Sequence, residues 1–593
     1  MNSATLFIPA ASLFILAGCQ PQTETTVPDR PTLEETEQAP PLRVWEKGAM
    51  VAAADPRAVD AGVKILRQGG TAIDAAIAVH AVLGLVEPQS SGLGGGAFMV
   101  YYDYEDDALT VFDGRETAPM AADENLFVVD GEVLDYVPAW QSGRSAGVPG
   151  MIALYKEAHE AEGEADWASL FQPAIELARD GFKVSPRLAG LLANEGLRGS
   201  MRLDEDEAAS AYFFPEGAPL TAGTLRANPD YAVLLDAVAT EGPSAFYAGE
   251  NAQAIVDALA QEPLPGAMTL EDIASYSVKV RPAVCGEHDT VRICSAPPPS
   301  SGAVTQNMIY GLYERMIGDA VETGYSDQKL AIWVDAQRLA YADRDHYVAD
   351  VDYVQVPTAD LIDPRYLDAR AGDASAPDAG PPPGDPGEVL GRGSMIGMWG
   401  RDLTEETPGT THISIIDRYG NAVSMTATVE SAFGNSRMVN GYLLNNELTD
   451  FSRQPRINNL PVANAPAGGK RPRSSMSPTM VFDKDGGLFM VTGSPGGNSI
   501  VAYVSKTILG VLNWDMTAQE AINLPNVIAR GPSVGVEVDV ERGQAWADAL
   551  SEAGYSVEER TGENSGLHVI VVREDGLEGG ADPRREGVAI ALD

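Results

Sequence analysis

One segment constrains the fold more than any other. Residues 71–86, TAIDAAIAVHAVLGLV, are apolar on almost every side of the helix that they predict. Thr71 is placed as an N-cap, since its hydroxyl can accept from backbone N–H groups in the first turn. The run ends at Glu87-Pro88, too soon to cross a bilayer, which takes about 20 apolar residues. We therefore expect a helix enclosed by protein, with His80 as a core residue rather than a ligand.

Composition narrows the class of protein. Apolar residues make up 44% of the 593 residues, ample for a large buried core. The formal net charge is −44, so the chain has no means of neutralising a run of nucleic-acid phosphates. The acidic residues are spread along the chain instead of forming one tail, which favours a solvated surface over an interaction segment. A globular protein that does not bind nucleic acid is expected.

The N-terminus predicts export. Residues 6–17 form a short apolar run that fits the core of a secretory signal, and the ending LAGC at Cys19 resembles the lipobox of bacterial lipoproteins. Residues 1–12 contain no Lys or Arg, which departs from that pattern, so a secreted protein without a lipid is the alternative. We expect a signal peptide over 1–18, lipidation of Cys19 and a flexible tether over 19–42. The remainder is expected on the periplasmic side of a bacterial membrane.

Two further cysteines, Cys285 and Cys294, flank a short predicted hairpin, GEHDTVRI. In an oxidising compartment they can form a disulfide; otherwise they are two small buried residues. Neither belongs to a metal-binding pattern, and the chain contains no HExxH or CxxC motif, so no metal is expected. The glycine loop over residues 91–96 precedes a predicted strand, whereas a phosphate-binding loop follows one. It indicates tight backbone packing rather than a nucleotide cofactor.

The order of elements predicts an α+β protein. Helical patterns dominate as far as about residue 280. Residues 373–393 hold five prolines and five glycines, so this stretch is expected to be exposed and irregular. Alternating strands joined by Gly- and Asn-bearing turns then follow, beginning with 411–416 and 422–429. Helices beside paired antiparallel strands indicate a layered arrangement.

The stretch PGTTHISII, from Pro408, places two threonines at the start of a strand. Such a junction suits a self-cleaving precursor, because Gly409 has no side chain to block its own carbonyl and Thr410 Oγ can attack it. Hydrolysis of the resulting ester would leave Thr410 as a new N-terminus, beside its own α-amine, a base with a pKa near about 8. Taken alone this signal is weak, because threonine is common in strands.

Eight ordered stretches make the signal specific. They are GGTAIDAAIAVHAVLGLVEPQSSGLGGGAFMVYYD, FDGRETAP, GPSAFYAGENAQAIV, PPPSSG, TTHISIIDRYGNAVSMTATVESAFG, LLNNELTDFS, KRPRSSMSPT and VTGSPGGN. From about Arg43 to its C-terminus the chain resembles the γ-glutamyltransferase (glutathione hydrolase) family of N-terminal-nucleophile hydrolases. The resemblance implies a four-layer αββα sandwich. It would be built jointly by a large subunit (43–409) and a small catalytic subunit (410–593) of a self-cleaved precursor.

The resemblance also assigns the reacting groups. Thr410 matches the nucleophile, and Thr428 matches a second threonine that hydrogen-bonds to the nucleophile's hydroxyl. Gly496 and Gly497, in GSPGGN, match the pair whose backbone N–H groups form an oxyanion hole, a feature worth roughly 3–4 kcal/mol in such sites. The bond between Gly409 and Thr410 is the implied cleavage site.

A pocket for a γ-glutamyl group is implied as well, and the end of that group carries an α-carboxylate and an α-ammonium. Arg115, Ser474 and Ser475 match residues that bind the carboxylate, and a guanidinium suits paired hydrogen bonds to it. Three acids match the ammonium side: Glu430, Glu447 and Asp450. Many family members carry Asn and Gln in place of the two glutamates, so this pocket is expected to be more anionic.

The implied reaction cleaves the γ-glutamyl amide of glutathione or a related compound through an acyl-enzyme, which passes to water, an amino acid or a dipeptide. No cofactor is implied. Residues 453–469, where some relatives place a lid with an aromatic residue, contain no Tyr, Phe or Trp. A partly open pocket that cleaves poly-γ-glutamate is therefore one hypothesis. The alternatives are a glutaryl (cephalosporin-type) acylase, which would leave Asp450 unpaired, and a non-catalytic lipoprotein that binds γ-glutamyl peptides.

Overall fold

The structure is a computed structural model that describes residues 45–592, apart from 263, 319–323 and 374–375. Three predictions lie outside the described residues: the signal peptide (1–18), lipidation at Cys19 and the tether (19–42). Within the described part of the chain, no helix is both long and apolar enough to span a membrane.

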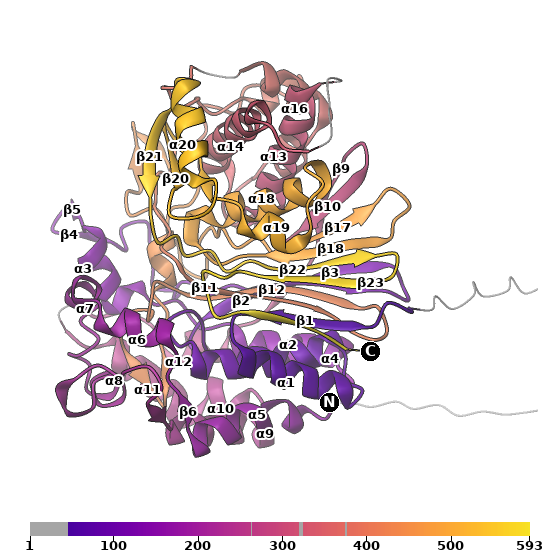
Figure 1. Ribbon diagram of the computed structural model, residues 1–593. Helices are drawn as coiled ribbons and strands as arrows, with labels where there is room; N and C mark the ends of the chain where they lie inside the picture. The colour runs from indigo at the N-terminus through magenta and orange to yellow at the C-terminus, as the bar shows by residue number, and fades with distance from the viewer. Residues whose placement is uncertain (1–44, 263, 319–323, 374–375, 593) are drawn as a thin grey trace, which may run out of the picture. The chain divides into compact units, whose positions relative to one another are not determined.

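Two antiparallel sheets form the centre of the fold (Figure 1). The first sheet has seven strands, in the spatial order β24 (Val588–Leu592), β1 (Ala49–Ala53), β11 (Gly409–Ile416), β12 (Ala422–Glu430), β2 (Gly96–Asp103), β3 (Ala108–Gly114) and β8 (Lys279–Pro282). The second has six, in the order β23 (Gly576–Ala581), β22 (His568–Arg573), β18 (Leu488–Gly493), β17 (Thr479–Asp483), β10 (Val291–Ser295) and β9 (Val284–Glu287).

Helices cover the outer face of each sheet (Figure 1). One face is covered by α1 (Pro56–Arg67) and α2 (Ala72–Val86), and the other by α13 (Gly302–Ile317) and α18 (Ile500–Asn513). Further helices pack on these, α5 (Trp167–Asp180) on α2 and α14 (Asp327–Tyr347) on α13. The alternation of side chains along β2 explains the layering. Met99 and Tyr101 pack in the core cluster that includes α2, whereas Phe98 and Val100 pack in the cluster that includes the second sheet. The predicted α+β fold, a four-layer αββα sandwich, is thereby confirmed.

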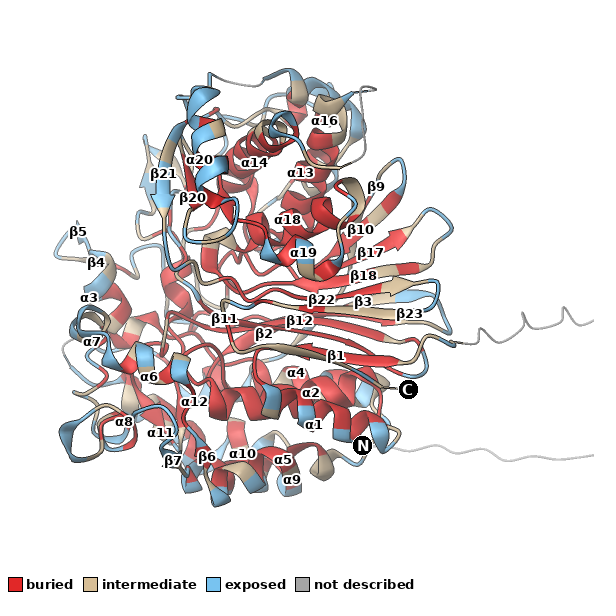
Figure 2. Ribbon diagram, in the orientation of Figure 1, coloured by how far each residue is buried: buried red, intermediate tan, exposed pale blue. Residues whose placement is uncertain are grey.

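Helix α2 is the enclosed helix that its sequence predicts. All its residues are buried, as the red ribbon in Figure 2 shows. Thr71 caps it: the Asp74 carboxylate accepts from the Thr71 N–H at 2.9 Å, and the Thr71 hydroxyl accepts from the Asp74 N–H at 3.4 Å. His80 is a core residue, as predicted. Its Nε2 lies 3.0 Å from Ser91 Oγ, and burial lowers its pKa to about 3.

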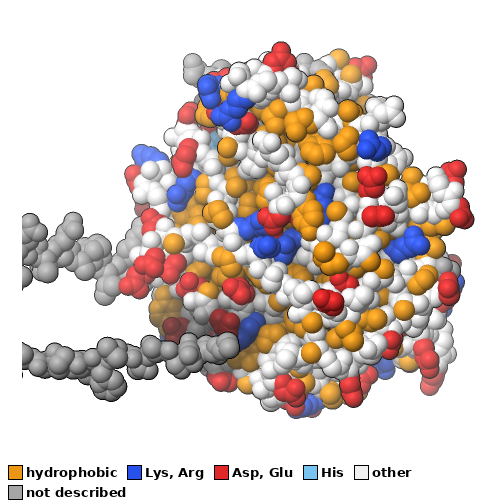
Figure 3. Space-filling model, turned by 180° about the vertical axis from the view of Figure 1, so that it is seen from behind, with side chains coloured by type: hydrophobic (Ala, Val, Ile, Leu, Met, Phe, Trp, Pro, Cys, Tyr) orange, Lys and Arg blue, Asp and Glu red, His pale blue; other side chains and the backbone are white. Residues whose placement is uncertain are grey.

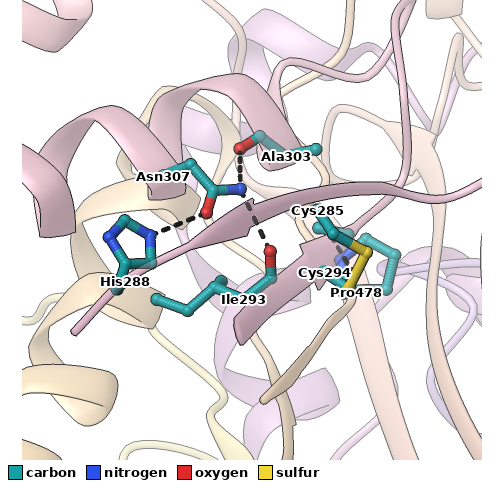
Figure 4. The surroundings of a disulfide bond; sticks show 8 residues. Cys285, His288, Ile293, Cys294, Ala303, Asn307 and Pro478 are labelled. Carbon is teal, nitrogen blue, oxygen red and sulfur yellow. Dashed lines mark hydrogen bonds between the residues drawn. A yellow bond between two sulfur atoms is a disulfide. The ribbon is translucent and has the colours of Figure 1, made fainter. Parts of the chain in front are cut away.

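A disulfide lies at the edge of the second sheet (Figure 4). Strands β9 and β10 place Cys285 opposite Cys294, and the two sulfurs are bonded. Asn307 on α13 fastens this hairpin, since its amide donates to Ile293 O at 3.2 Å and its Oδ1 lies 2.9 Å from His288 Nε2. Of the two alternatives left open by the sequence, the structure contains the disulfide.

One expected loop is partly helical. Residues 373–393 are predicted to be irregular and exposed, but α17 (Pro386–Val389) forms inside this stretch, with Pro386 buried. The cause is Asp385, whose carboxylate accepts from the N–H of Glu388 at 3.1 Å and of Met395 at 3.0 Å. Proline at the first helical position fits, because that position needs no N–H partner.

Acidic side chains are spread over the surface instead of being gathered in one place. On the face seen in Figure 3, acidic side chains are scattered among apolar and uncharged groups instead of forming one patch. Dispersed negative charge favours hydration of the surface and repels polyanions. This agrees with the interpretation of the acidic residues as a solvated surface.

Candidate active site

Thr410 lies at the start of β11, in the middle of the first sheet. It is paired with Thr428 on β12, and the register shifts between Gly409 and Thr410. Such a bulge redirects the chain locally, and here it falls at the bond that the sequence marks as a cleavage site. Thr410 is 3% exposed, so its hydroxyl is surrounded by protein groups.

A short chain of hydrogen bonds fixes the hydroxyl proton of Thr410. Thr428 Oγ1 donates to Gly409 O at 2.9 Å and accepts from the N–H of Glu430 at 2.8 Å. Because the one proton of Thr428 is committed to Gly409, the 3.2 Å contact between the two threonine hydroxyls has Thr410 as its donor. The arrangement directs the Thr410 proton towards Thr428 and polarises the Gly409 carbonyl.

The glycine loop before β2 holds Thr428 in place. A Cβ on Gly95 would lie 1.9 Å from Thr428 O, and one on Gly94 would lie 2.1 Å from Leu443 O. Only a residue without a side chain permits this approach. The tight backbone packing predicted for residues 91–96 is confirmed, and it sets the position of the strand that carries Thr428.

Arg115, directly after β3, is fully buried among acids. Its guanidinium contacts Glu447 Oε1, lies 2.6 Å from Asp450 Oδ2 and donates to Arg473 O at 2.8 Å. Burial opposes the charge of Arg115, but Glu447 and Asp450 outweigh it and raise the pKa of the guanidinium. Burial also raises the pKa of Glu447 and of Asp450 well above the usual range, although Arg115 opposes both shifts. In this continuous chain Arg115 is the counter-ion of these acids.

Glu430 ends β12 and is bound by a residue that precedes the predicted cleavage site. Its Oε1 accepts from the N–H of Thr407 at 2.8 Å and from the Thr407 hydroxyl at 2.9 Å. Its Oε2 accepts from the hydroxyl of Ser431 at 2.6 Å and of Tyr136 at 3.3 Å. Tyr136 does not stand out in the sequence, because no local pattern links residues 294 positions apart.

Ser474 and Ser475 lie in an extended segment before β17. Ser474 Oγ accepts from the N–H of Met476 at 3.1 Å, and the Ser475 N–H donates to Glu406 Oε2 at 2.8 Å. Arg344, on α14, contacts both the Ser475 hydroxyl and the Glu406 carboxylate. Neither Arg344 nor Glu406 stands out in the sequence, because acid–arginine pairs are common on protein surfaces and this one becomes buried only in the fold.

Gly496 and Gly497 form the turn between β18 and α18. Their φ angles of +141° and +56° belong to a region that favours glycine. Backbone N–H groups at a turn that opens a helix are suited to stabilise an anion. A Cβ on Gly497 would lie 2.3 Å from Glu406 O, so the chain before Thr410 runs directly against this turn.

A cavity of about 10 Å³ connects these groups. Eight of the ten predicted catalytic and substrate-binding residues line it: Arg115, Thr410, Thr428, Glu430, Glu447, Asp450, Ser474 and Gly497. Gly496 instead lines an open cleft of about 700 Å³, and Glu406 lines both spaces. The cavity has room for about one water molecule. The segment before Thr410 therefore lies between the predicted nucleophile and the open cleft.

Comparisons with known proteins identify the family of the chain. The Gamma-glutamyltranspeptidase family model matches residues 58–592. The chain is 34% identical over 551 residues to the glutathione hydrolase proenzyme of Escherichia coli (strain K12), a match that covers 91% of each chain. It is 32% identical over 559 residues to the glutathione hydrolase proenzyme of Bacillus subtilis (strain 168), covering 92% of each.

A solved structure supports the fold. The crystal structure of cephalosporin acylase from Bacillus halodurans superposes with a TM-score of 0.78, covering 95% of this chain and 100% of that one. Its sequence identity is 23%, so this likeness concerns the fold alone. Together with the family match over residues 58–592, these findings show that the chain belongs to the γ-glutamyltranspeptidase family.

Proposed function

We propose that this chain is a γ-glutamyltransferase and glutathione hydrolase that first cuts itself between Gly409 and Thr410. The observation that carries the proposal is the buried hydrogen-bond chain from Thr410 through Thr428 to the Gly409 carbonyl. It occurs in a member of the γ-glutamyltranspeptidase family. The relatives from E. coli and B. subtilis are named proenzymes, which fits a precursor.

In the proposed cut, Thr410 Oγ attacks the carbonyl carbon of Gly409. Its proton passes to Thr428 Oγ1 while the proton of Thr428 passes to the Gly409 oxygen, from which it reaches the departing nitrogen. A new C–O bond forms, the C–N bond between Gly409 and Thr410 breaks, and the freed nitrogen takes up a proton to become an α-amine. Water then hydrolyses the ester and releases the carboxylate of Gly409. The Thr428 hydroxyl already donates to the oxygen on which negative charge develops, which is the requirement for an oxyanion donor.

The two products, residues 43–409 and 410–593, are proposed to stay together as a large and a small subunit. Strands from both sides of the cut alternate in the first sheet, where β11 and β12 lie between β1 and β2. Separating the products would expose both core clusters, each of which contains residues from before and after Thr410.

After the cut, the α-amine of Thr410 is the general base for its own hydroxyl, since an α-amine has a pKa near about 8. Thr410 Oγ attacks the γ-carbonyl of the donor, with N–H groups at Gly496 and Gly497 facing the oxyanion. The amine leaves with a proton, and a γ-glutamyl ester remains on Thr410. The γ-glutamyl group is then transferred to water, an amino acid or a dipeptide. For glutathione, the leaving amine is cysteinylglycine.

The pocket is proposed to recognise the zwitterionic end of the donor. Arg115, Ser474 and Ser475 would bind the α-carboxylate. The α-ammonium would bind the acidic side of the cavity, formed by Glu430, Glu447 and Asp450. An ammonium is the partner that this excess of buried carboxylates lacks, because Arg115 is the one cation among the described residues that line the cavity.

Export is part of the proposal. The Cys285–Cys294 disulfide fits an oxidising compartment such as the bacterial periplasm. A signal peptide over residues 1–18, with Cys19 lipidated, would place the enzyme on the periplasmic side of a membrane. Labelling with a fatty-acid analogue, compared between the natural chain and Cys19→Ala, tests the anchor independently of activity.

Thr410→Ala tests the proposed function. We expect this variant to remain one chain and to release no γ-glutamyl product, whereas Thr410→Ser retains both reactions. Thr411→Val is the matched control, because Thr411 is buried beside Thr410 and its hydroxyl has no hydrogen-bond partner among the described residues. Self-cleavage or turnover by Thr410→Ala would contradict the role of this residue.

A further inference from the structure

The segment just before the cleavage site occupies the donor pocket of the continuous chain. Residue Glu406 lines both the small cavity at Thr410 and the cleft of about 700 Å³ outside it. Its carbonyl oxygen lies 2.3 Å from the position that a Cβ on Gly497 would take. Removal of this segment would therefore join the cavity to the cleft and uncover the glycine turn.

Glu406 and Thr407 present a carboxylate and an N–H donor to the pocket, which correspond to the carboxylate and the ammonium of a zwitterionic donor. The Glu406 carboxylate accepts from the Ser475 N–H at 2.8 Å and contacts the Arg344 guanidinium. The adjacent Thr407 N–H donates to Glu430 Oε1 at 2.8 Å. An anionic group thus lies on the side assigned to the α-carboxylate, and an N–H donor lies on the side assigned to the α-ammonium.

Arg473 depends on the same segment for its counter-ions. Its side chain is fully buried, with Nη2 3.0 Å from Asp402 Oδ2 and Nε 3.8 Å from Glu406 Oε1. None of its side-chain nitrogens meets hydrogen-bond geometry with another described residue. Both of its acidic partners lie before Thr410, so movement of the cut segment would leave Arg473 without an ion pair among the described residues.

Arg344 differs from Arg473 in this respect. If the cut segment moved, Arg344 would keep its ion pair with Asp345, in which Nη1 lies 2.9 Å from Oδ1. Arg530 binds the same carboxylate, with Nε 3.2 Å from Oδ2. Burial opposes ionisation of Glu406, but Arg344 and Arg473 outweigh it and lower the pKa of its carboxyl, so Glu406 is an anion in this position. Movement of the segment that carries Asp402 and Glu406 would leave Arg473 without its acidic partners and Arg344 with Asp345, which Arg530 shares. Such an excess of buried positive charge favours binding of another anion.

We propose that Glu406-Thr407 is an internal placeholder for the donor, and that self-cleavage exposes Arg473, together with Arg344, as a second carboxylate-recognition site beside Ser475. The inference rests on the proposed function and deepens it. Arg115 is already paired with Glu447 and Asp450. The positive charge of Arg115 is therefore partly neutralised by two acids. Arg473 then supplies further positive charge for the donor's α-carboxylate.

The inference defines a substrate class. Amides of a 4-carbon acyl chain that carries both an ammonium and a carboxylate should react well. A 4-aminobutanoyl amide, which lacks the α-carboxylate, should gain nothing from Arg473. Since a guanidinium–carboxylate pair in a buried site acts mainly on binding, Arg473 is expected to affect KM more than kcat.

The test compares Arg473→Met with the natural enzyme on two p-nitroanilides, L-γ-glutamyl and 4-aminobutanoyl. We expect KM for the γ-glutamyl anilide to rise at least about tenfold with kcat changed less than about threefold. We expect kcat/KM for the 4-aminobutanoyl anilide to change less than about twofold. Arg179→Met, at an exposed surface pair, is the control and should match the natural enzyme on both compounds. Equal losses on the two anilides, or an unchanged KM, would overturn the role of Arg473.

Two further measurements distinguish a variant that does not fold from failure of the placeholder and from failure of the proposed function. If Arg473→Met does not fold, Arg473→Lys replaces it, with an expected rise in KM of about threefold for the γ-glutamyl anilide alone. Calorimetric binding of L-glutamate should be at least about tenfold weaker for the uncut Thr410→Ala chain than for the cut natural chain. Equal affinities would overturn the placeholder. Absence of γ-glutamyl turnover by the natural enzyme and Arg179→Met alike would instead contradict the proposed function, and glutamate binding would still decide the inference.

Discussion

The side-chain oxygens of Thr410 and Thr428 lie 3.2 Å apart on two neighbouring strands. Thr428 also donates to the carbonyl oxygen of Gly409, at 2.9 Å. One hydroxyl therefore accepts a hydrogen bond from Thr410 and donates one to the Gly409 carbonyl. These two contacts are the ones on which the proposed self-cleavage depends.

Replacement of Thr428 by valine should slow self-cleavage by about a hundred- to a thousandfold, the usual effect of removing one oxyanion donor. Valine keeps the shape and the strand preference of threonine, so the fold should be retained. Thr428→Ser should keep most of the rate. Band intensities on a denaturing gel over time measure it, with Thr240→Val, on the exposed end of α9 (Pro229–Glu241), as control. Cleavage of Thr428→Val at the natural rate would exclude the proton path described above.

Asp450→Asn should raise KM for the γ-glutamyl anilide by about a hundredfold, because the donor's ammonium loses a buried carboxylate. The same variant should change KM for glutaryl p-nitroanilide less than about threefold, since that donor has no ammonium. Steady-state kinetics on the two compounds measure the difference. Asp368→Asn, whose carboxylate is exposed, is the control. Equal effects on both donors would show that Asp450 acts on the fold and not on the ammonium.

The buried carboxyl of Glu116 should make stability depend on pH. Burial raises its pKa from 4.5 to about 7, although the charge of Arg115 opposes the shift. The folded state therefore favours the protonated form. Its contribution to the free energy of unfolding is complete below about pH 4.5 and is lost as the pH rises to about 7, with a slope of at most about 1.4 kcal/mol per pH unit.

Urea unfolding of the uncut Thr410→Ala chain, with and without Glu116→Gln, measures this effect between pH 4.5 and 7.5. Other titrating groups contribute to both chains, so the difference between them isolates Glu116. We expect the chain with Glu116 to lose stability relative to the Gln variant as the pH rises. A difference that stays constant with pH would show that Glu116 does not titrate in this window.

Removal of the Cys285–Cys294 disulfide should lower the free energy of unfolding by about 2–3 kcal/mol, the loop-closure value for a short loop. The sequence separation is 9 residues. Strand β9 is an edge strand and does not contribute to the cavity, so the activity of the folded enzyme should be unchanged. Thermal unfolding and steady-state rates of the Cys285→Ser/Cys294→Ser double variant test both statements. A loss of turnover in the folded variant would contradict the second.

Much of the fold could be predicted from local patterns. The all-round apolar segment became the buried helix α2, and the strands expected over 411–416 and 422–429 are β11 and β12 with ends shifted by at most two residues. These patterns succeed because burial on one side or on all sides imposes a period on the sequence. The eight family motifs supplied the candidate site, and the cavity brings most of its residues together.

The remaining contacts depend on distant parts of the chain. Tyr136 reaches Glu430 from 294 positions away, and Glu406 meets Ser475 from 69 positions away. Periodicity reports whether a residue is buried and not which residue it meets. The helix at Pro386 could not be predicted from composition for a related reason. It depends on the Asp385 carboxylate, which accepts hydrogen bonds from the N–H groups of Glu388 and Met395.

The most direct measurement follows the junction before Thr410 in the natural protein while its activity develops. Intact-mass spectrometry of freshly refolded chain, sampled in parallel with γ-glutamyl release, should show a 184-residue fragment (593 − 409) that starts at Thr410. Activity should rise in proportion to that fragment. Full turnover by material whose bond between Gly409 and Thr410 is intact, or a cut at another position in the active form, would contradict the account.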